Sequence, residues 1–125
     1  MTPYAGEPDT AANRLRYLPR DLAFQMLTRR LSILAKQENA PFASCTANVN
    51  ESYHFFRNAS VELNGKPENW RAALTVAEQE LRRALEYGFQ PAELGEATAN
   101  YLNSLEQGAK SASTRRSDDL AGELI

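Results

Sequence analysis

Residues 42–63 read FASCTANVNESYHFFRNASVEL, and this stretch determines the fold class. Two runs rich in β-branched and aromatic residues, 42–49 and 53–63, are separated by Asn50-Glu51-Ser52, which we interpret as a turn. In the second run a more apolar set of alternate positions is interleaved with a more polar set: Phe55, Arg57, Ala59, Val61 and Leu63 against Phe56, Asn58, Ser60 and Glu62. The pattern predicts an antiparallel hairpin with one face covered by helices and the other open to solvent or a partner.

Helical periodicity surrounds the hairpin, so the chain is predicted to be α+β. Helices are expected at about 19–37, 67–87, 91–108 and 114–124. Pro19 and Pro91 suit the first turn of a helix, where a missing N–H costs nothing. Gly88 suits a helix end, because glycine readily adopts a positive φ.

The apolar stripes of these helices indicate which residues face the core. The first helix is expected to bury Leu22, Met26, Leu27, Leu31, Ile33, Leu34 and Ala35. The second is expected to bury Trp70, Ala73, Leu74, Ala77, Leu81, Ala84 and Leu85, with Glu78, Glu80, Arg82, Arg83 and Glu86 in water. The third is expected to bury Leu94, Ala97, Tyr101, Leu102 and Leu105.

A hairpin alone is marginally stable, since sheets normally need three or more strands. We therefore expect a further strand, supplied by a segment before residue 1, by the first residues or by a second copy of the chain. Residues 1–17 are polar and are predicted to be a loop or arm. Residues 18–125 are predicted to form a single, partial α+β domain.

Bulk composition excludes several classes of function. The 125 residues include 14 basic and 16 acidic side chains, for a net charge of −2, whereas nucleic-acid-binding domains usually present a strongly basic face. No apolar run approaches the roughly 18 residues that span a bilayer. We expect neither a nucleic-acid nor a membrane partner.

His54 is the only histidine and Cys45 the only cysteine. Catalytic zinc normally takes three protein ligands and a water, so no zinc site is expected in this chain. A Cys45–His54 catalytic pair is the weaker interpretation, because no orienting acid or oxyanion motif accompanies it. Burial of an unreactive thiol is the commoner state of cysteine.

Charged side chains on the predicted helices are interpreted as surface and packing residues. They are the glutamates Glu78, Glu80, Glu86, Glu93 and Glu96 and the doublets Arg29-Arg30, Arg82-Arg83 and Arg115-Arg116. Paired carboxylates can carry out acid–base catalysis. Ion pairs between helix positions i and i+4 are far more frequent, and we favour them here.

Aromatic residues near the turn form the best candidate contact surface. We assign a possible peptide or partner contact to Tyr53, His54 and Phe56, since extended peptides add to exposed sheet edges. Phe55 is expected in the core.

Three ordered phrases resemble the insulinase/pitrilysin family of zinc metallopeptidases over residues 13–125. They are LTRRL (27–31) leading to APF (40–42), ELRRAL (80–85) leading to GFQPAEL (88–94), and TRRS (114–117) leading to LAGEL (120–124). They are most similar to the second, non-zinc domain in the N-terminal half of bacterial members.

The resemblance implies a fragment of a multidomain peptidase whose α+β domains enclose a peptide. Zinc is expected in the parent enzyme, on an H-x-x-E-H helix that this chain lacks, so the chain contributes no catalytic, metal or cofactor residue. Expected partners are the other domains and the peptide substrate, in a bacterial periplasm or cytoplasm. Exposed apolar surface predicts a homo-oligomer of the fragment. The alternatives are an inactive scaffold or interaction subunit of the same family, and an unrelated α+β binding module.

Overall fold

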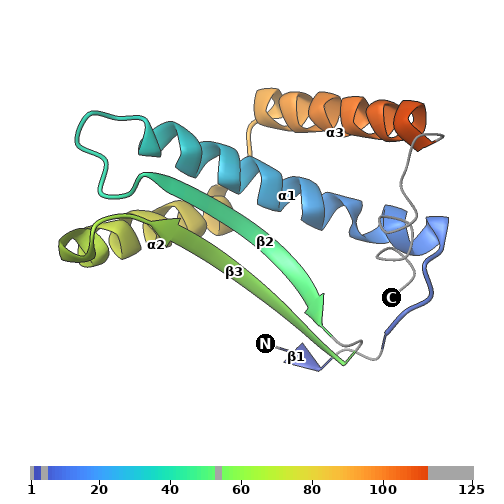
Figure 1. Ribbon diagram of the computed structural model, residues 1–125, viewed down its shortest axis with the longest axis horizontal. Coiled ribbons are helices and arrows are strands. Elements are labelled where there is room, and N and C mark those ends of the chain that lie inside the picture. The colour runs from blue at the N-terminus through green and yellow to red at the C-terminus, as the bar shows by residue number, and fades with distance from the viewer. Residues whose placement is uncertain (1, 4–5, 53–54, 113–125) are drawn as a thin grey trace.

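The structure is a computed structural model that describes residues 2–3, 6–52 and 55–112, and it confirms the α+β class (Figure 1). Its strands are β1 (Thr2–Pro3), β2 (Ser44–Ser52) and β3 (Phe56–Asn64), and its helices are α1 (Ala11–Ala35), α2 (Trp70–Tyr87) and α3 (Pro91–Ser111). A short 3₁₀ turn, Pro67–Asn69, leads into α2. The predicted helix at 114–124 lies outside the described residues.

The sheet is antiparallel, with the strand order β1-β3-β2. Of the three predicted sources of a further strand, the first residues supply one, because Thr2 pairs with Arg57 and Pro3 with Phe56. The predicted turn is wrong. Residues 50–52 continue β2 and pair with 58–56, since the ladder extends to the pair Ser52–Phe56.

Alternation along the hairpin separates a covered face from a polar face, as predicted. Cys45 and Ala47 of β2 lie opposite Leu63 and Val61 of β3, and all four belong to the main core cluster with Leu27, Leu31 and Phe42. On the other face, Asn48 pairs with Ser60, whose hydroxyl donates to the Asn48 side-chain oxygen at 2.9 Å. The sheet therefore has one apolar and one polar surface.

The helices form a layer on the apolar side. α1 packs on β2 and α2 packs on β3, while α3 lies against α1 in a position remote from the sheet (Figure 1). A smaller cluster of Leu22, Met26 and Ala97 joins α1 to α3. None of the described helices is long and apolar enough to cross a membrane.

The first helix begins earlier than predicted. It starts at Ala11, so part of the predicted arm is helical and Pro19 lies inside the helix rather than in its first turn. Thr10 is the N-cap, and its hydroxyl accepts a hydrogen bond from the Asn13 N–H at 3.2 Å. The cap stabilises the added turns even though Pro19 cannot donate to the carbonyl one turn earlier.

The predicted buried faces are partly wrong. In α1, Leu22, Met26, Leu27 and Leu31 are buried as predicted, but Ile33 is 49% exposed. In α2, only Ala73, Ala77 and Glu80 are buried, and in α3 only Ala97. Trp70, Leu74, Leu81 and Leu85, which we call the α2 stripe, are exposed by 58, 58, 39 and 78%, and Leu94, Leu102 and Leu105 of α3 are also exposed. Alanines, the smallest apolar side chains of α2 and α3, make the contacts of these helices with the core. The apolar surface of each helix is therefore wider than the part of it that is buried.

The ends of α2 and α3 follow the predicted signals. Gly88 follows α2 with a φ of 68° and donates its N–H to the Ala84 carbonyl at 3.0 Å. Pro91 is the first residue of α3. Glu93 completes a capping box, because its carboxylate accepts the Gln90 N–H at 2.7 Å.

Candidate functional site

The predicted aromatic contact lies at the closed end of the hairpin. Phe56 is the half-buried first residue of β3, and its ring packs edge-on against Phe55, with centroids 5.0 Å apart. Phe55 precedes the strand and is 61% exposed, so its predicted core position is wrong. Residues 53–54, with Tyr53 and His54, lie outside the described residues.

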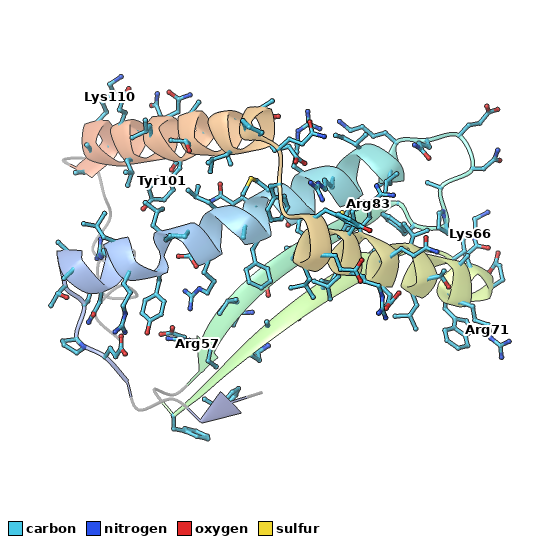
Figure 2. The ribbon with its side chains drawn as sticks, turned by 180° about the vertical axis from the view of Figure 1, so that it is seen from behind. Arg57, Lys66, Arg71, Arg83, Tyr101 and Lys110 are labelled. Atoms are coloured by element: carbon cyan, nitrogen blue, oxygen red, sulfur yellow. The ribbon has the colours of Figure 1, made fainter. Side chains whose placement is uncertain are left out.

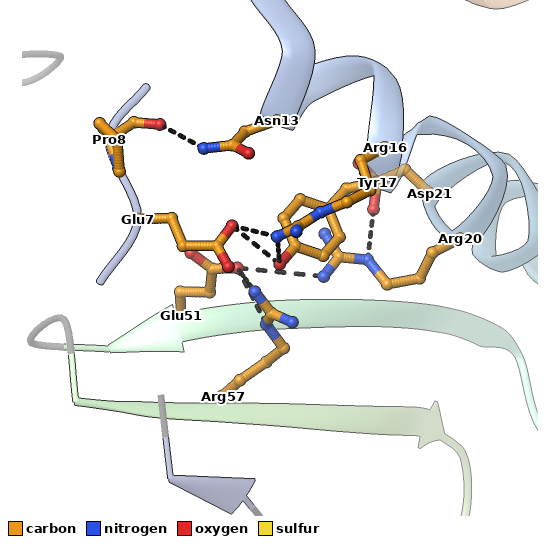
Figure 3. Close-up of polar contacts among 9 residues, drawn as sticks. All are labelled: Glu7, Pro8, Asn13, Arg16, Tyr17, Arg20, Asp21, Glu51 and Arg57. Atoms are coloured by element: carbon orange, nitrogen blue, oxygen red, sulfur yellow. Dashed lines mark hydrogen bonds and ion pairs between the residues drawn. The ribbon is translucent and has the colours of Figure 1, made fainter. Parts of the chain in front are cut away.

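Tyr17 lies at the centre of a charged cluster beside this end of the hairpin (Figure 3). The guanidinium carbons of Arg16, Arg20 and Arg57 lie 4.7, 4.5 and 4.6 Å from the centroid of its ring. Its hydroxyl donates to Glu7 at 2.9 Å and accepts from Arg16 at 2.6 Å. The cluster thus joins the segment before α1, α1 itself and the hairpin.

The three arginines of this cluster face three carboxylates. Arg16 binds Glu7, Arg20 donates to Asp21 at 2.8 Å, and Arg57 donates to Glu51 at 2.9 Å. Arg16, and then the Tyr17 hydroxyl, lower the pKa of Glu7, while the Tyr17 hydroxyl and Glu51 raise the pKa of Arg57. Because the charges are already matched, we interpret the cluster as an anchor for the hairpin and not as an anion site.

Arg30 is the second point where distant segments meet. Its Nε and Nη2 donate to the two carboxylate oxygens of Glu93 at 2.6 and 2.7 Å, and Nη2 also donates to the Gly88 carbonyl at 3.0 Å. The guanidinium lies 4.6 Å from the centroid of the Phe89 ring. One α1 side chain therefore fixes the turn between α2 and α3.

Electrostatics at this contact stabilise the charged forms of both partners. Arg30, together with the Gln90 N–H, lowers the pKa of Glu93 to about 2, and Glu93 raises the pKa of Arg30. One turn further along α3, Glu96 pairs with Arg29 at 2.8 Å, and both side chains are about half exposed. Glu78 pairs with Arg82 at i,i+4 on the exposed face of α2, which confirms a surface role for these two charges. Glu80 was predicted to lie in water and is buried instead, and its carboxylate pairs with Arg83 at i,i+3.

Cys45 is buried in the covered face of β2. Its thiol lies 3.6 Å from the Ser32 hydroxyl and 3.8 Å from the Thr28 carbonyl, and it pairs with Leu63 at the end of the hairpin remote from Ser52 and Phe56. Within the described ranges, no group of three or more histidine, cysteine or acidic residues is placed to hold a metal ion.

Thr28 is a structural residue that the sequence analysis missed. Its hydroxyl accepts the Ala47 N–H at 2.9 Å and donates to the Ala47 carbonyl at 3.2 Å. Both backbone groups lie on the outer edge of β2, so α1 covers this edge at its centre. In the sequence Thr28 is a single threonine among apolar positions of the helix, and nothing in this pattern indicates its hydrogen-bond partner.

The α2 stripe borders two apolar hollows and is the best candidate contact surface. One hollow, of about 260 Å³, lies beside Trp70 and Leu74 at the end of β3, and the other, of about 300 Å³, lies between Leu81, Leu85 and Phe24 of α1. Figure 2 shows the molecule from behind with its side chains, and labels Arg71 and Arg83 on α2. The α2 stripe is therefore a surface suited to packing against another protein.

Comparisons with protein-family models, with curated proteins and with solved structures each find no match.

Proposed function

We propose that this chain is a non-catalytic domain of a zinc-dependent peptidase, where it forms part of the wall of the substrate chamber. The proposal rests on the resemblance of its ordered phrases to the insulinase/pitrilysin family. In such an enzyme the zinc ion and the catalytic base come from another domain. This domain shapes the chamber and helps to exclude folded proteins.

The observation that supports the proposal is the contact of Arg30 with Gly88, Phe89 and Glu93. Arg30 belongs to the first phrase and its three partners to the second, and they bind across three hydrogen bonds and a ring contact. The first and second phrases are thus in direct contact through Arg30. A domain whose most specific side chains hold helices together is suited to a structural role.

A second candidate function is an inactive scaffold or interaction subunit of the same family. The α2 stripe favours it, because exposed apolar patches of this kind mark sites of protein contact. In that case the chain binds a separate active subunit.

Reading the gene around codons 1–125 tests the two candidates. We expect an H-x-x-E-H segment upstream in the same reading frame for the chamber wall, and in the gene of a partner for the scaffold. A reading frame that starts at Met1 excludes the chamber wall as stated. If the frame does start at Met1, the scaffold is excluded in turn when no zinc peptidase encoded by a neighbouring gene binds this chain.

An activity assay tests the non-catalytic role directly. The purified chain with added zinc is expected to leave a peptide library intact, and zinc-dependent cleavage by the pure chain contradicts the proposal. Binding to the zinc-holding domain or subunit is expected to weaken with Leu85→Arg in the α2 stripe. Glu86→Arg, at the neighbouring exposed position, is the matched control and should leave binding unchanged.

A further inference from the structure

A hollow between α1, α2 and the start of α3 brings opposite charges and apolar side chains together. Its volume is about 420 Å³, and small-molecule sites begin at about 300 Å³. Its wall includes Arg30, Ile33 and Leu34 of α1, Glu80 and Arg83 of α2, and Glu93 of α3. The space therefore suffices for a small polar molecule.

Glu80 brings a negative charge into this wall. Among the residues that the structure describes, it is the only charged one that is buried, with 6% of its surface exposed. Its ion-pair partner is Arg83, whose Nη1 lies 2.9 Å from Glu80 Oε1 and whose side chain is 63% exposed. Burying a carboxylate is costly unless it is well paired. A second cationic partner, bound in the hollow and shielded from water, would stabilise the Glu80 carboxylate.

Arg30 brings a positive charge that is only partly neutralised. Its Nε and Nη2 bind Glu93 and the Gly88 carbonyl, but Nη1 is buried and has no hydrogen-bond partner in the described part of the chain. Glu93 raises the pKa of Arg30 most, and Glu80 adds to this effect, so Glu80 lies within electrostatic reach of the guanidinium. Because Nη1 is buried, it acts on the hollow through its charge and not through direct contact.

Ile33 and Leu34 supply the apolar part of the wall. Ile33 belongs to the stripe that was predicted to face the core, yet 49% of its surface is exposed. A molecule with an apolar side chain would cover this surface and gain from its removal from water.

We propose that this hollow binds a free α-amino acid with an apolar side chain, such as leucine. The ammonium group donates to the Glu80 carboxylate, the carboxylate accepts from the Arg83 guanidinium, and the side chain packs on Ile33 and Leu34. The inference uses only the hollow, so it goes beyond the peptidase proposal and does not depend on it.

The balance of charges favours a zwitterion over other small ligands. Two arginines, Arg30 and Arg83, and two glutamates, Glu80 and Glu93, contribute equal numbers of positive and negative charges to the wall. A phosphate would lie against the glutamates and a polyamine against the arginines, and both contacts are repulsive. The terminus of a peptide carries only one of the two charged groups, so it would leave either Glu80 or Arg83 without the added partner.

A ligand series on the complete chain tests which groups are bound. In a protein-observed NMR titration, L-leucine is expected to bind saturably with a Kd of about 0.1–1 mM. L-leucinamide, which imitates a peptide N-terminus, and N-acetyl-L-leucine, which imitates a C-terminus, should each bind at least about tenfold more weakly, because each lacks one charge-assisted contact. Absence of saturable binding of L-leucine overturns the proposal, and so does equal binding of either derivative.

Substitutions on α2 locate the bound molecule. Glu80→Gln keeps the shape of the side chain, removes its charge and should weaken the binding of L-leucine at least about tenfold. Glu78→Gln, on the exposed face of the same helix, is the matched control and should bind as the parent does. Equal binding by a folded Glu80→Gln variant, or an equal loss in both variants, overturns the proposal.

Arg83 keeps the test decisive if Glu80→Gln does not fold, because its side chain is mostly exposed. Arg83→Gln should weaken binding at least about tenfold, whereas Arg82→Gln, at the neighbouring exposed position, should not change it. Denaturant unfolding checks that both variants fold. Equal binding of L-leucine by Arg83→Gln and the parent overturns the proposal.

Discussion

Thr28 and Ala47 exchange two hydrogen bonds through one hydroxyl group, which accepts the Ala47 N–H at 2.9 Å and donates to the Ala47 carbonyl at 3.2 Å. Ala47 is only 6% exposed, so water does not readily replace this partner. The Thr28 hydroxyl satisfies the outward backbone groups of Ala47 in β2, as a neighbouring strand does elsewhere in a sheet. The two edges of the hairpin therefore differ, because a side chain of α1 pairs with the β2 edge and β1 pairs with the β3 edge.

Thr28→Val is expected to destabilise the fold by about 1–3 kcal/mol, because it keeps the shape of the side chain and leaves two buried backbone groups without a partner. Thr28→Ser keeps the hydroxyl and is the control. Urea unfolding measures the difference, and light scattering should also detect more aggregation in the valine variant, since its β2 edge is less protected. Equal unfolding free energies for the two variants would show that Thr28 does not stabilise the edge.

Arg30→Met should cost about 2–3 kcal/mol, because it removes three hydrogen bonds and leaves the Glu93 carboxylate and the Gly88 carbonyl with fewer partners. Arg29→Met is the matched control. It breaks the half-exposed pair with Glu96 and should cost less than about 1 kcal/mol. Chemical denaturation of both variants tests the ranking, and a larger loss for Arg29→Met contradicts it.

The pH dependence of stability should carry a contribution from Glu93. Its pKa is lowered to about 2 in the folded protein by Arg30 and the Gln90 N–H, against 4.5 as the ordinary value. A lowered folded pKa gives stability that is fully present above about pH 4.5 and is lost as the pH falls towards 2. Unfolding curves from pH 6 downward should therefore converge for the parent and Glu93→Gln, and parallel curves would show that the carboxylate is not linked to folding.

Two glycines should respond to alanine with opposite signs. A Cβ on Gly65 would lie 2.9 Å from the Pro41 carbonyl oxygen and 3.1 Å from the Phe42 Cα, and both are backbone atoms. Gly65→Ala should therefore cost on the order of 1–3 kcal/mol. At Gly95, within α3, an added Cβ meets no atom within 4 Å, so Gly95→Ala should stabilise by about 0.5–1 kcal/mol. Thermal unfolding of the two variants provides the measurement, and shifts of the same sign contradict the prediction.

Local patterns predicted the hairpin and its faces well. The alternation of Ala59, Val61 and Leu63 with Asn58, Ser60 and Glu62 depends only on the two-residue period of a strand, so parity alone assigns each side chain to a face. The strand ends were less accurate, because Asn50, Glu51 and Ser52 are as frequent in turns as at the end of a polar strand. Their pairing depends on the partner strand.

Contacts between distant segments were mostly not predictable from the sequence. The helical period identified an apolar stripe on α2, but it did not indicate that Ala73 and Ala77 face the core while Trp70 and Leu74 face outward. The pairs Arg30–Glu93 and Thr28–Ala47 are set by how the elements pack. By contrast, the start of α1 could have been predicted, because Thr10 is a good N-cap residue. Assigning Pro19 to the first turn of the helix placed the predicted start too late in the chain.

The pairing of β1 with β3 also has a kinetic consequence. The hairpin and α1 are neighbours along the chain, whereas Thr2 must find Arg57 across the whole of α1 and β2. Closing so long a loop costs entropy that two residue pairs repay only after the rest has formed. We expect β1 to dock last during refolding and to detach first under mild denaturant, so that the chain reaches its final topology in two steps separable by pulsed hydrogen exchange.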